Sequence, residues 1–313
     1  GGGGPPLTAA TTVLKFSIAG LKIPLFIEGV YASTNYAASF LLMQLLGFRL
    51  ATKQPSVTAA ALAAKLREGS STERLGAFAE EAARITRSQF AAVIGNLGSV
   101  VPTCLLVEYA IRLSTGKGLL SVGTAKHVIH TLNPTSPLTW FCAALTGVLL
   151  WSSSIVAGWS ENWVVYRRLP EALGGHPTLL TWLGAPRAKR LASRFLHNVA
   201  GVGGNVSLGV FLGMTPVLGR FFGLPLDVRH VTLSAGALTF AACGLGPEFL
   251  HSDEFWRSAL GIGVIGLLNF GVSFFLSLVV AARARNVEGM HLLRLIVAVT
   301  KRFLRGPLAF FFP

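Results

Sequence analysis

The sequence has little charge of either sign, and very little negative charge. Of its 313 residues only 13% are charged, against 52% that are hydrophobic, and the mean hydropathy is +0.59. Soluble globular domains are about one-quarter charged. The composition therefore argues against a soluble enzyme and favours a chain that meets lipid over much of its surface.

Cysteine is also scarce, and its placement excludes two further classes of protein. Cys104, Cys142 and Cys243 all lie in apolar stretches, without a second Cys or a His at metal-ligand spacing. Neither a disulfide framework nor a zinc site is indicated, and we expect core residues, no metal and no cofactor. The segment Gly1–Pro6 has no initiating Met and no basic region typical of a signal peptide, so we expect it to be the cut edge of a longer protein.

Long apolar runs are the main positive feature of the sequence. A membrane-spanning helix needs about 20 apolar residues, and in lipid its backbone must satisfy its own polar groups. The predicted fold class is therefore an all-α, polytopic helical integral membrane protein, with about six spanning helices and one Gly-rich segment that is broken or re-entrant. Six runs carry no charge or one: residues 30–48, 90–111, 137–157, 198–219, 231–247 and 258–282.

The formal net charge of +14 is concentrated in three places. Seven basic residues lie between Arg49 and Arg87, six between Arg167 and Arg194, and six between Arg283 and Arg305. Cytoplasmic loops of membrane proteins carry an excess of Lys and Arg. We therefore expect a multi-pass protein of the bacterial inner membrane with these regions, and the C-terminus, in the cytoplasm. An additional anionic partner such as nucleic acid is the alternative explanation.

This placement of the charges constrains the number of crossings. Three apolar runs separate the second basic region from the third, but two regions on one side require an even number of crossings. The run 198–219 holds six glycines and Pro216, which weaken a helix, so we expect it to be the broken or re-entrant element. The short run 231–247 is the alternative. Gly209 and Gly213 also form a GxxxG pair, which serves ordinary close packing of helices.

The pattern divides the chain into four parts. Residues 1–49 are expected to form a membrane helical hairpin, and residues 50–89 a cytoplasmic helical insert. Residues 90–289 are expected to form the membrane helical domain. Residues 290–313 alternate apolar and basic residues, which is typical of an amphipathic helix on an anionic leaflet.

The densest polar cluster near an apolar run is Asp227, Arg229 and His230. Ionisable residues at membrane depth are candidates for a functional site, and His titrates near neutral pH. A satisfied structural turn is the alternative. If the Gly-rich run lines a pathway, its candidate lining residues are Gly203, Gly204 and Asn205.

Three further polar residues are candidates with structural alternatives. Glu161 and Asn162 lie between two tryptophans, where they suit a cation or headgroup site or a helix cap at the interface. Glu108 lies near the end of an apolar run, where it is either functional or extended toward the interface. Asn205 and Asn269 are expected to bond to neighbouring helices.

Five stretches together resemble one family: LATKQPSVTAAALAAKL (50–66), RSQFAAVIGNLGSVVP (87–102), AGWSENWVVYRRLPEAL (157–173), GGNVSLGVFLGMTPVLG (203–219) and GLPLDVRHVTLSAG (223–236). The chain resembles the bacterial transmembrane proteins of the site-specific recombinase family. The resemblance implies that the chain is the membrane half of a protein about twice its length. The missing N-terminal helical half is then a candidate partner. The family name implies DNA recombination, but the resemblance brings no catalytic residues to carry over.

The residues of the chain do not form a known recombinase site. Tyrosine recombinases need an HxxR motif followed by a nucleophilic Tyr, yet the one HxxR is His291 to Arg294, and the last tyrosine is Tyr166. Metal-dependent strand transfer needs clustered carboxylates, whereas the 13 acidic residues are scattered. We therefore lean toward a protein that is not an enzyme, with a transport or channel-like role. The alternatives are a membrane-anchored DNA-binding protein and a membrane scaffold, and the bilayer is the expected partner in every case.

Overall fold

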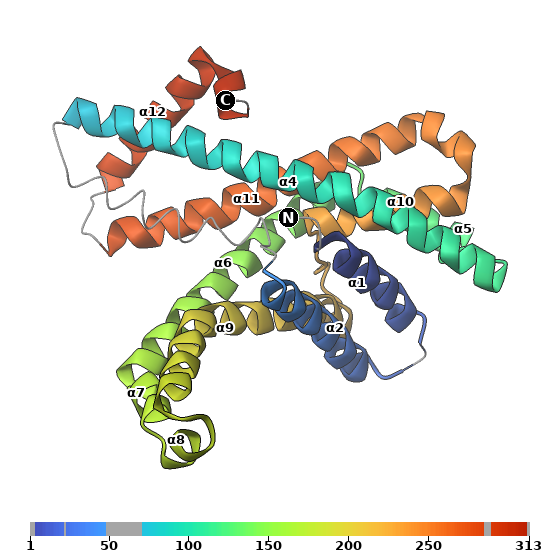
Figure 1. Cartoon of the computed structure of the whole chain (residues 1–313). Coiled ribbons are helices and arrows are strands. Elements are labelled where there is room, and N and C mark those ends of the chain that lie inside the picture. Colours follow the sequence, from blue (N-terminus) through green and yellow to red (C-terminus); the bar gives the residue numbers. More distant parts are fainter. Residues whose placement is uncertain (1–3, 22, 48–70, 285–288, 312–313) are drawn as a thin grey trace.

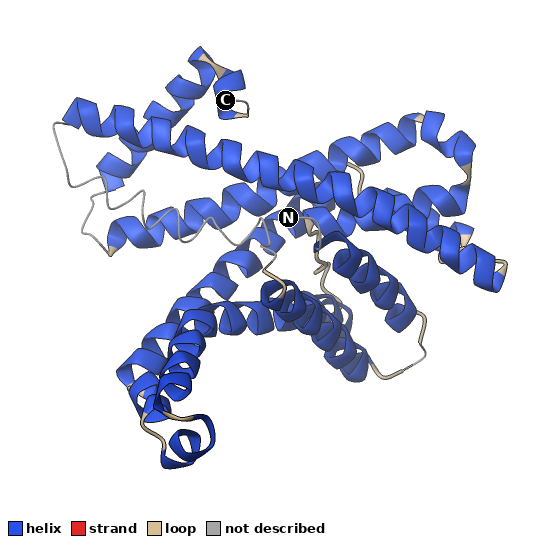
Figure 2. Ribbon diagram, in the orientation of Figure 1, coloured by secondary structure: helices blue, strands red, loops and turns tan. Residues whose placement is uncertain are grey.

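The computed structural model describes residues 4–21, 23–47, 71–284 and 289–311, and all the regular structure in them is helical (Figures 1 and 2). This confirms the predicted all-α class. The chain order is α1 (Gly4–Ala19), α2 (Leu25–Leu45), α4 (Ser71–Thr115), α5 (Val122–Thr131), α6 (Pro137–Tyr166), α7 (Leu169–Gly174), α8 (Pro177–Leu183), α9 (Ala185–Phe222), α10 (Val231–Leu245), the 3-10 helix η3 (Pro247–His251), α11 (Asp253–Arg283), α12 (Gly289–Arg305) and the 3-10 helix η4 (Pro307–Phe310).

Four helices are long and apolar enough to cross a membrane. They are α4 over Gly76–Thr115, α6, α9, and α11 over Asp253–Ala281. Not all of the six predicted spans are found among the described residues. The run 30–48 falls largely in α2, which places Ser33, Thr34 and Asn35 at its middle. The run 231–247 forms α10, whose 15 residues extend about 22 Å, short of the roughly 30 Å hydrocarbon core.

The predicted break in the run 198–219 is wrong. This run lies inside α9, one uninterrupted helix of 38 residues that contains Pro216. Propensity penalties for glycine are a weak prior that tertiary packing overrides. The glycines of α9 are accommodated because α2 and α6 pack closely against them.

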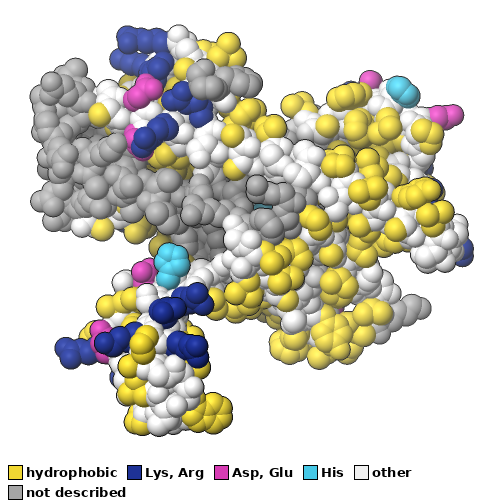
Figure 3. Space-filling view, viewed as in Figure 1, with side chains coloured by type: hydrophobic (Ala, Val, Ile, Leu, Met, Phe, Trp, Pro, Cys, Tyr) yellow, Lys and Arg dark blue, Asp and Glu magenta, His cyan; other side chains and the backbone are white. Residues whose placement is uncertain are grey.

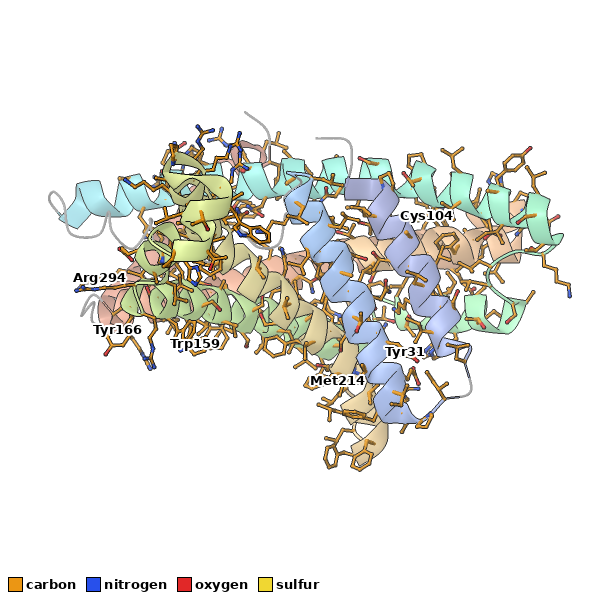
Figure 4. All side chains as sticks on the ribbon, turned by 60° about the horizontal axis from the view of Figure 1, so that its bottom comes forward. Tyr31, Cys104, Trp159, Tyr166, Met214 and Arg294 are labelled. Carbon is orange, nitrogen blue, oxygen red and sulfur yellow. The ribbon has the colours of Figure 1, made fainter. Side chains whose placement is uncertain are left out.

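The close packing is clearest between α2 and α9. A Cβ added at Gly209 would lie 2.5 Å from the Ala37 backbone nitrogen, and one at Gly213 would overlap the Ser33 backbone. This confirms the packing role of the GxxxG pair. Gly29 provides the reciprocal contact from α2, since a Cβ there would lie 2.6 Å from the Met214 sulfur. Met214 is labelled on α9 in Figure 4, where α9 passes α2.

Helix α10 is the most enclosed element of the described chain. Eleven consecutive residues, Val231–Ala241, are buried, and the helix packs against α1, α4, α5 and α11. Small residues on every side of α10, such as Ser234, Ala235 and Gly236, allow this enclosure because neighbouring helices approach closely over them.

Two of the parts predicted from composition, the insert 50–89 and the tail 290–313, can be compared with the helices. Most of the predicted insert 50–89 lies outside the described residues, and its last part belongs to α4, which continues through residue 90 without a break. The predicted tail contains α12, which packs against the first part of α4. There Arg302 lies 3.2 Å from Glu80.

Basic side chains gather away from the apolar centre of the molecule. Figure 3 shows Lys and Arg on the arm built by α7, α8 and the start of α9, and again near α12, while the described surface in the right-hand part of the view is mainly hydrophobic or uncharged. Trp159 and Tyr166 are exposed on α6 toward the end that carries α7 (Figure 4). The fold therefore keeps the charge-rich ends apart from its apolar middle.

Candidate functional site

A stretch without regular structure connects α9 to the enclosed helix α10. Helix α9 ends at Gly223, whose φ of 66° lies in the left-handed region that glycine adopts easily. Residues 224–230 then run without helix until α10 begins, and Arg229 and His230 within them are buried. Non-helical backbone at membrane depth is stable only where protein or water covers it.

Side chains from two neighbouring helices satisfy the backbone of this stretch. The Arg229 N–H donates to the Thr146 hydroxyl of α6 at 2.9 Å. The Val231 N–H donates to Asn269 Oδ1 of α11 at 3.1 Å, and Asn269 Nδ2 donates to the carbonyls of Arg229 and Ala143, each at 2.9 Å. One fully buried amide therefore joins α6, α11 and the irregular stretch, as predicted for Asn269.

These contacts locate the start of α10 along a candidate span. Asn269 lies near the middle of α11, so α10 begins about half-way along that helix. Helix α10 ends beside the start of α11, because η3, which follows α10 directly, packs against both. After α9 the chain thus runs inward to the middle of α11, and α10 leads it back to the start of α11.

A cavity of about 450 Å³ opens beside this stretch, between α1, α2, α5, α9 and the start of α10. Its polar lining includes His127 of α5 and His230 at the N-terminus of α10. Its charged lining residues come from four separate parts of the chain: Lys15, Glu28, Arg220, Asp227 and Arg229.

Two ion pairs occupy part of the cavity wall. Arg220 Nη2 of α9 lies 2.6 Å from Glu28 Oε1 of α2, and Arg229 Nη2 lies 3.1 Å from Asp227 Oδ2. Among the described residues no carboxylate lies within 4.0 Å of Lys15. The cavity wall therefore has three cations and two carboxylates, and Lys15 is the cation without a carboxylate partner among the described residues.

Arg229 is the most constrained of these charges. It is only 5% exposed. Its Nε and Nη1 atoms are buried and have no hydrogen-bond partner in the part of the chain that the structure describes. A buried donor without an acceptor destabilises a protein by about 1–3 kcal/mol, so Arg229 is a costly residue at this place unless the site uses it.

The structure brings together some of the residues predicted from the sequence. Asp227, Arg229 and His230 line one cavity. Asn205 does not: its Nδ2 donates to Gln44 Oε1 at 2.5 Å, and so ties α9 to the far end of α2, as expected of an interhelical asparagine.

The two glycines that precede Asn205 also lie outside the cavity. A Cβ at Gly203 would overlap Ser160 of α6, and Gly204 is buried. All three residues of this predicted pathway lie near the middle of α9, before the part of the helix that lines the cavity, and act in helix packing.

The remaining predicted residues lie elsewhere. Glu161 and Asn162 are exposed on α6. Glu108 is buried on α4, where it accepts from Arg112 Nε at 2.8 Å and from the Leu119 N–H at 3.2 Å. It lines a second, mainly apolar cavity of about 660 Å³ between α4, α10, η3 and α11.

Sequence reasoning did not single out Lys15 and Arg220 as site residues. Both are cations within or beside an apolar run, and this signal was available because ionisable residues at membrane depth are rare. The pairing of Arg220 with Glu28 was beyond reach, since 192 positions separate them. No group of three or more His, Cys, Asp or Glu side chains is placed to hold a metal ion within the ranges the structure describes.

The fold and the site define an all-helical protein with four long apolar helices, which indicate a multi-pass membrane protein, and with a charged cavity beside a short enclosed helix. Over residues 1–313 the chain matches the family model described as site-specific recombinase, and it belongs to that family. No curated protein and no solved structure matches it.

Proposed function

We propose that this protein has a transport or channel-like role, in which a small polar solute occupies the cavity at the junction of α9 and α10. The observation that carries the proposal is the position of the cavity. It holds five charged side chains beside a stretch of non-helical backbone that reaches the middle of α11. Membrane proteins tolerate such backbone and such charges where they line a path for solutes.

In this proposal α10 is the re-entrant element. It is too short to cross, and it lies between two candidate spans, α9 and α11. The segment 224–245 would then enter the membrane from the side where α9 ends and return to the same side. With α10 not crossing, the second and third basic regions lie on one side, as the positive-inside rule requires.

Accessibility of the cavity from both sides of the membrane tests the proposal. Ala32 lines the cavity from α2 and is half-buried, so a single cysteine is placed there by Ala32→Cys after the three native cysteines are replaced by alanine. The membrane-impermeant anion MTSES is applied to right-side-out and to inside-out vesicles. Leu267→Cys, on an exposed apolar position of α11, is the matched control.

A pathway predicts that Ala32→Cys reacts from both faces while Leu267→Cys reacts from neither. Reaction of Ala32→Cys from one face only would show a binding pocket without a pathway, and would contradict a transport role. Absence of reaction from both faces would contradict the cavity itself.

The second candidate function is binding of DNA, which the family description suggests for its members. The observation that favours it is the basic arm, where Arg187, Lys189 and Arg190 are exposed at the start of α9. Proteins that neutralise phosphates lose affinity steeply as salt rises.

Neutralising these three residues together should then weaken duplex binding and reduce the slope of log K against log salt by about 0.9 for each phosphate that the arm no longer neutralises. The control neutralises Lys117, Lys126 and Arg257, which are exposed outside the arm. Equal effects of the two triple variants would reject a DNA-binding arm.

A further inference from the structure

We infer that the solute of the cavity is a small oxyanion, held between Lys15 and Arg229 at the N-terminus of α10. The inference rests on the proposed function for the place of the site, and it adds the class of solute. Three separate features of the cavity lead to it: its charge balance, the unused donors of Arg229 and the direction of α10.

The charge balance of the cavity wall is positive. Lys15, Arg220 and Arg229 face two carboxylates, Glu28 and Asp227. Two of the three cations are paired with these carboxylates, and Lys15 has no carboxylate within 4.0 Å among the described residues. In a site with low-dielectric walls an unpaired charge acts more strongly than in water. The wall therefore attracts an anion and disfavours a cation.

Arg229 supplies directional donors in addition to charge. The ion pair with Asp227 uses only the Nη2 atom of Arg229. The Nε and Nη1 atoms of Arg229 are buried without an acceptor in the described structure. A guanidinium presents its N–H groups as a planar fork that matches the oxygens of carboxylate and phosphate. An oxyanion in the cavity would use the binding capacity that Asp227 leaves free.

Helix α10 presents its N-terminus to the same cavity. His230, Leu233 and Ser234, all in or next to its first turn, line the cavity. The helix has no side-chain hydrogen bond at its N-cap. The N-terminus of a helix carries a partial positive charge that favours an anion, and this holds for α10 although Asn269 accepts from its first N–H. Arg229 immediately precedes this turn, so both features act on one place.

The charge preference of the cavity is measured on the purified full chain in detergent, with Ala32→Cys in the cysteine-free background. Rates of reaction with the anionic reagent MTSES and the cationic reagent MTSET are compared with the same ratio for a small free thiol. We expect a preference for MTSES on the order of tenfold, as for other electrostatically focused clefts. Lys15→Met should abolish most of it. Lys126→Met, at an exposed position of α5 outside the cavity, should leave it unchanged.

Occupation of the site is measured by protection with the uncharged reagent methyl methanethiosulfonate. At constant ionic strength, inorganic phosphate or succinate replaces chloride, and at least one of them should slow the reaction in a saturable way. Lys15→Met and Arg229→Gln should each weaken protection at least tenfold. Arg229→Lys, which keeps the charge and loses the fork, should weaken it less than Arg229→Gln does.

A rate ratio equal to that of the free thiol would overturn the inference, and so would a preference for MTSES without saturable protection by either anion. If Arg229→Gln does not fold, Lys15→Met decides the outcome, because Lys15 is half-buried and makes no ion pair among the described residues. If an anion protects Ala32→Cys and this cysteine is labelled from one membrane face only, the anion site is supported and the transport role is contradicted. If Ala32→Cys is labelled from both faces and neither anion protects it, the transport role is supported and the anion site is contradicted.

Discussion

Single polar residues hold the irregular stretch 224–230 in place. Asn269 is fully buried and makes three hydrogen bonds, two of them to backbone groups of Arg229 and Val231 that no helix satisfies. Thr146 satisfies a further N–H of the same stretch. These side chains thus satisfy backbone groups of this segment, as intrahelical hydrogen bonds satisfy those of the surrounding helices.

Replacing Asn269 by leucine should therefore destabilise the protein strongly. Asn269→Leu leaves the Val231 N–H and the Arg229 carbonyl without partners, at a cost of about 1–3 kcal/mol for each group. Unfolding by titration with SDS in detergent micelles measures the change. Asn162→Leu, at an exposed position of α6, is the control and should alter stability little. Equal effects of the two substitutions would contradict the role given to Asn269.

The ion pair of Arg229 leads to a second prediction at this scale. Among the described residues, Asp227 is the one carboxylate within 4.0 Å of the Arg229 guanidinium, which is 5% exposed, so Asp227→Asn is expected to weaken folding by about 1–3 kcal/mol. Asp227 itself is 45% exposed, which limits the loss. The same SDS titration on Glu161→Gln, an exposed carboxylate of α6, provides the comparison. A stability of Asp227→Asn as high as that of Glu161→Gln would show that the pair contributes nothing to the fold.

At the scale of elements, α2 and α9 form a close glycine-mediated contact. Backbone meets backbone at Gly209 and Gly213, and Gly29 of α2 meets the side chains of Met214 and Val217 of α9. Without a hydrophobic driving force between helices in lipid, such close van der Waals packing supplies much of the association. This contact also fixes one wall of the charged cavity, since Gly213 lines it.

Gly213→Ala should separate this pair of helices. The added methyl group overlaps Ser33 backbone that cannot move aside, and overpacking of this kind costs about 1–3 kcal/mol. Gly263→Ala on α11 is the matched control, since nothing lies within 4 Å of the new Cβ and the helix propensity of alanine is higher. Thermal unfolding in detergent should rank Gly213→Ala below the parent and Gly263→Ala at or above it. The opposite order would contradict the packing assigned to Gly213.

The sequence predicted some elements well and others poorly, for identifiable reasons. Long uncharged runs predicted α6 and α11, because hydropathy depends only on local composition. Glycine and Pro216 led to a false break in α9, because the partner surface of α2 that compensates for them is not visible in the run itself. The cluster Asp227 to His230 was found as a local pattern. Lys15 and Arg220 join it only through the tertiary fold.

At the scale of the whole molecule, the charges and the helix contacts support one arrangement. Gln44, at the end of α2, donates to the Asn198 carbonyl, one turn after Arg194 in the basic first part of α9. Phe78, early in α4, clusters with Leu278 near the end of α11. The opposite ends meet as well, since Arg112 at the end of α4 donates to the Cys243 carbonyl near the end of α10. Helix ends next to the basic regions therefore contact one another, as expected if these regions share one side of a membrane.

The same arrangement predicts where the short helix α10 begins and ends. If α9 and α11 cross and α10 does not, the chain leaves the membrane after Phe222 and again after Leu245 on one side. The acidic residues Glu248, Asp253 and Glu254 follow on that side, away from the basic regions. A full crossing by α10 would instead place the second and third basic regions on opposite sides.

Cysteine labelling of intact cells and of inside-out vesicles tests this arrangement most directly, with single cysteines at three exposed positions: Trp182→Cys in the basic arm, Phe222→Cys at the end of α9, and His251→Cys after α10. An impermeant maleimide should label Phe222→Cys and His251→Cys from the same face, and Trp182→Cys only from the opposite face. Labelling of Phe222→Cys and His251→Cys from opposite faces would show that α10 crosses the membrane. That result would contradict a re-entrant segment that carries the charged cavity.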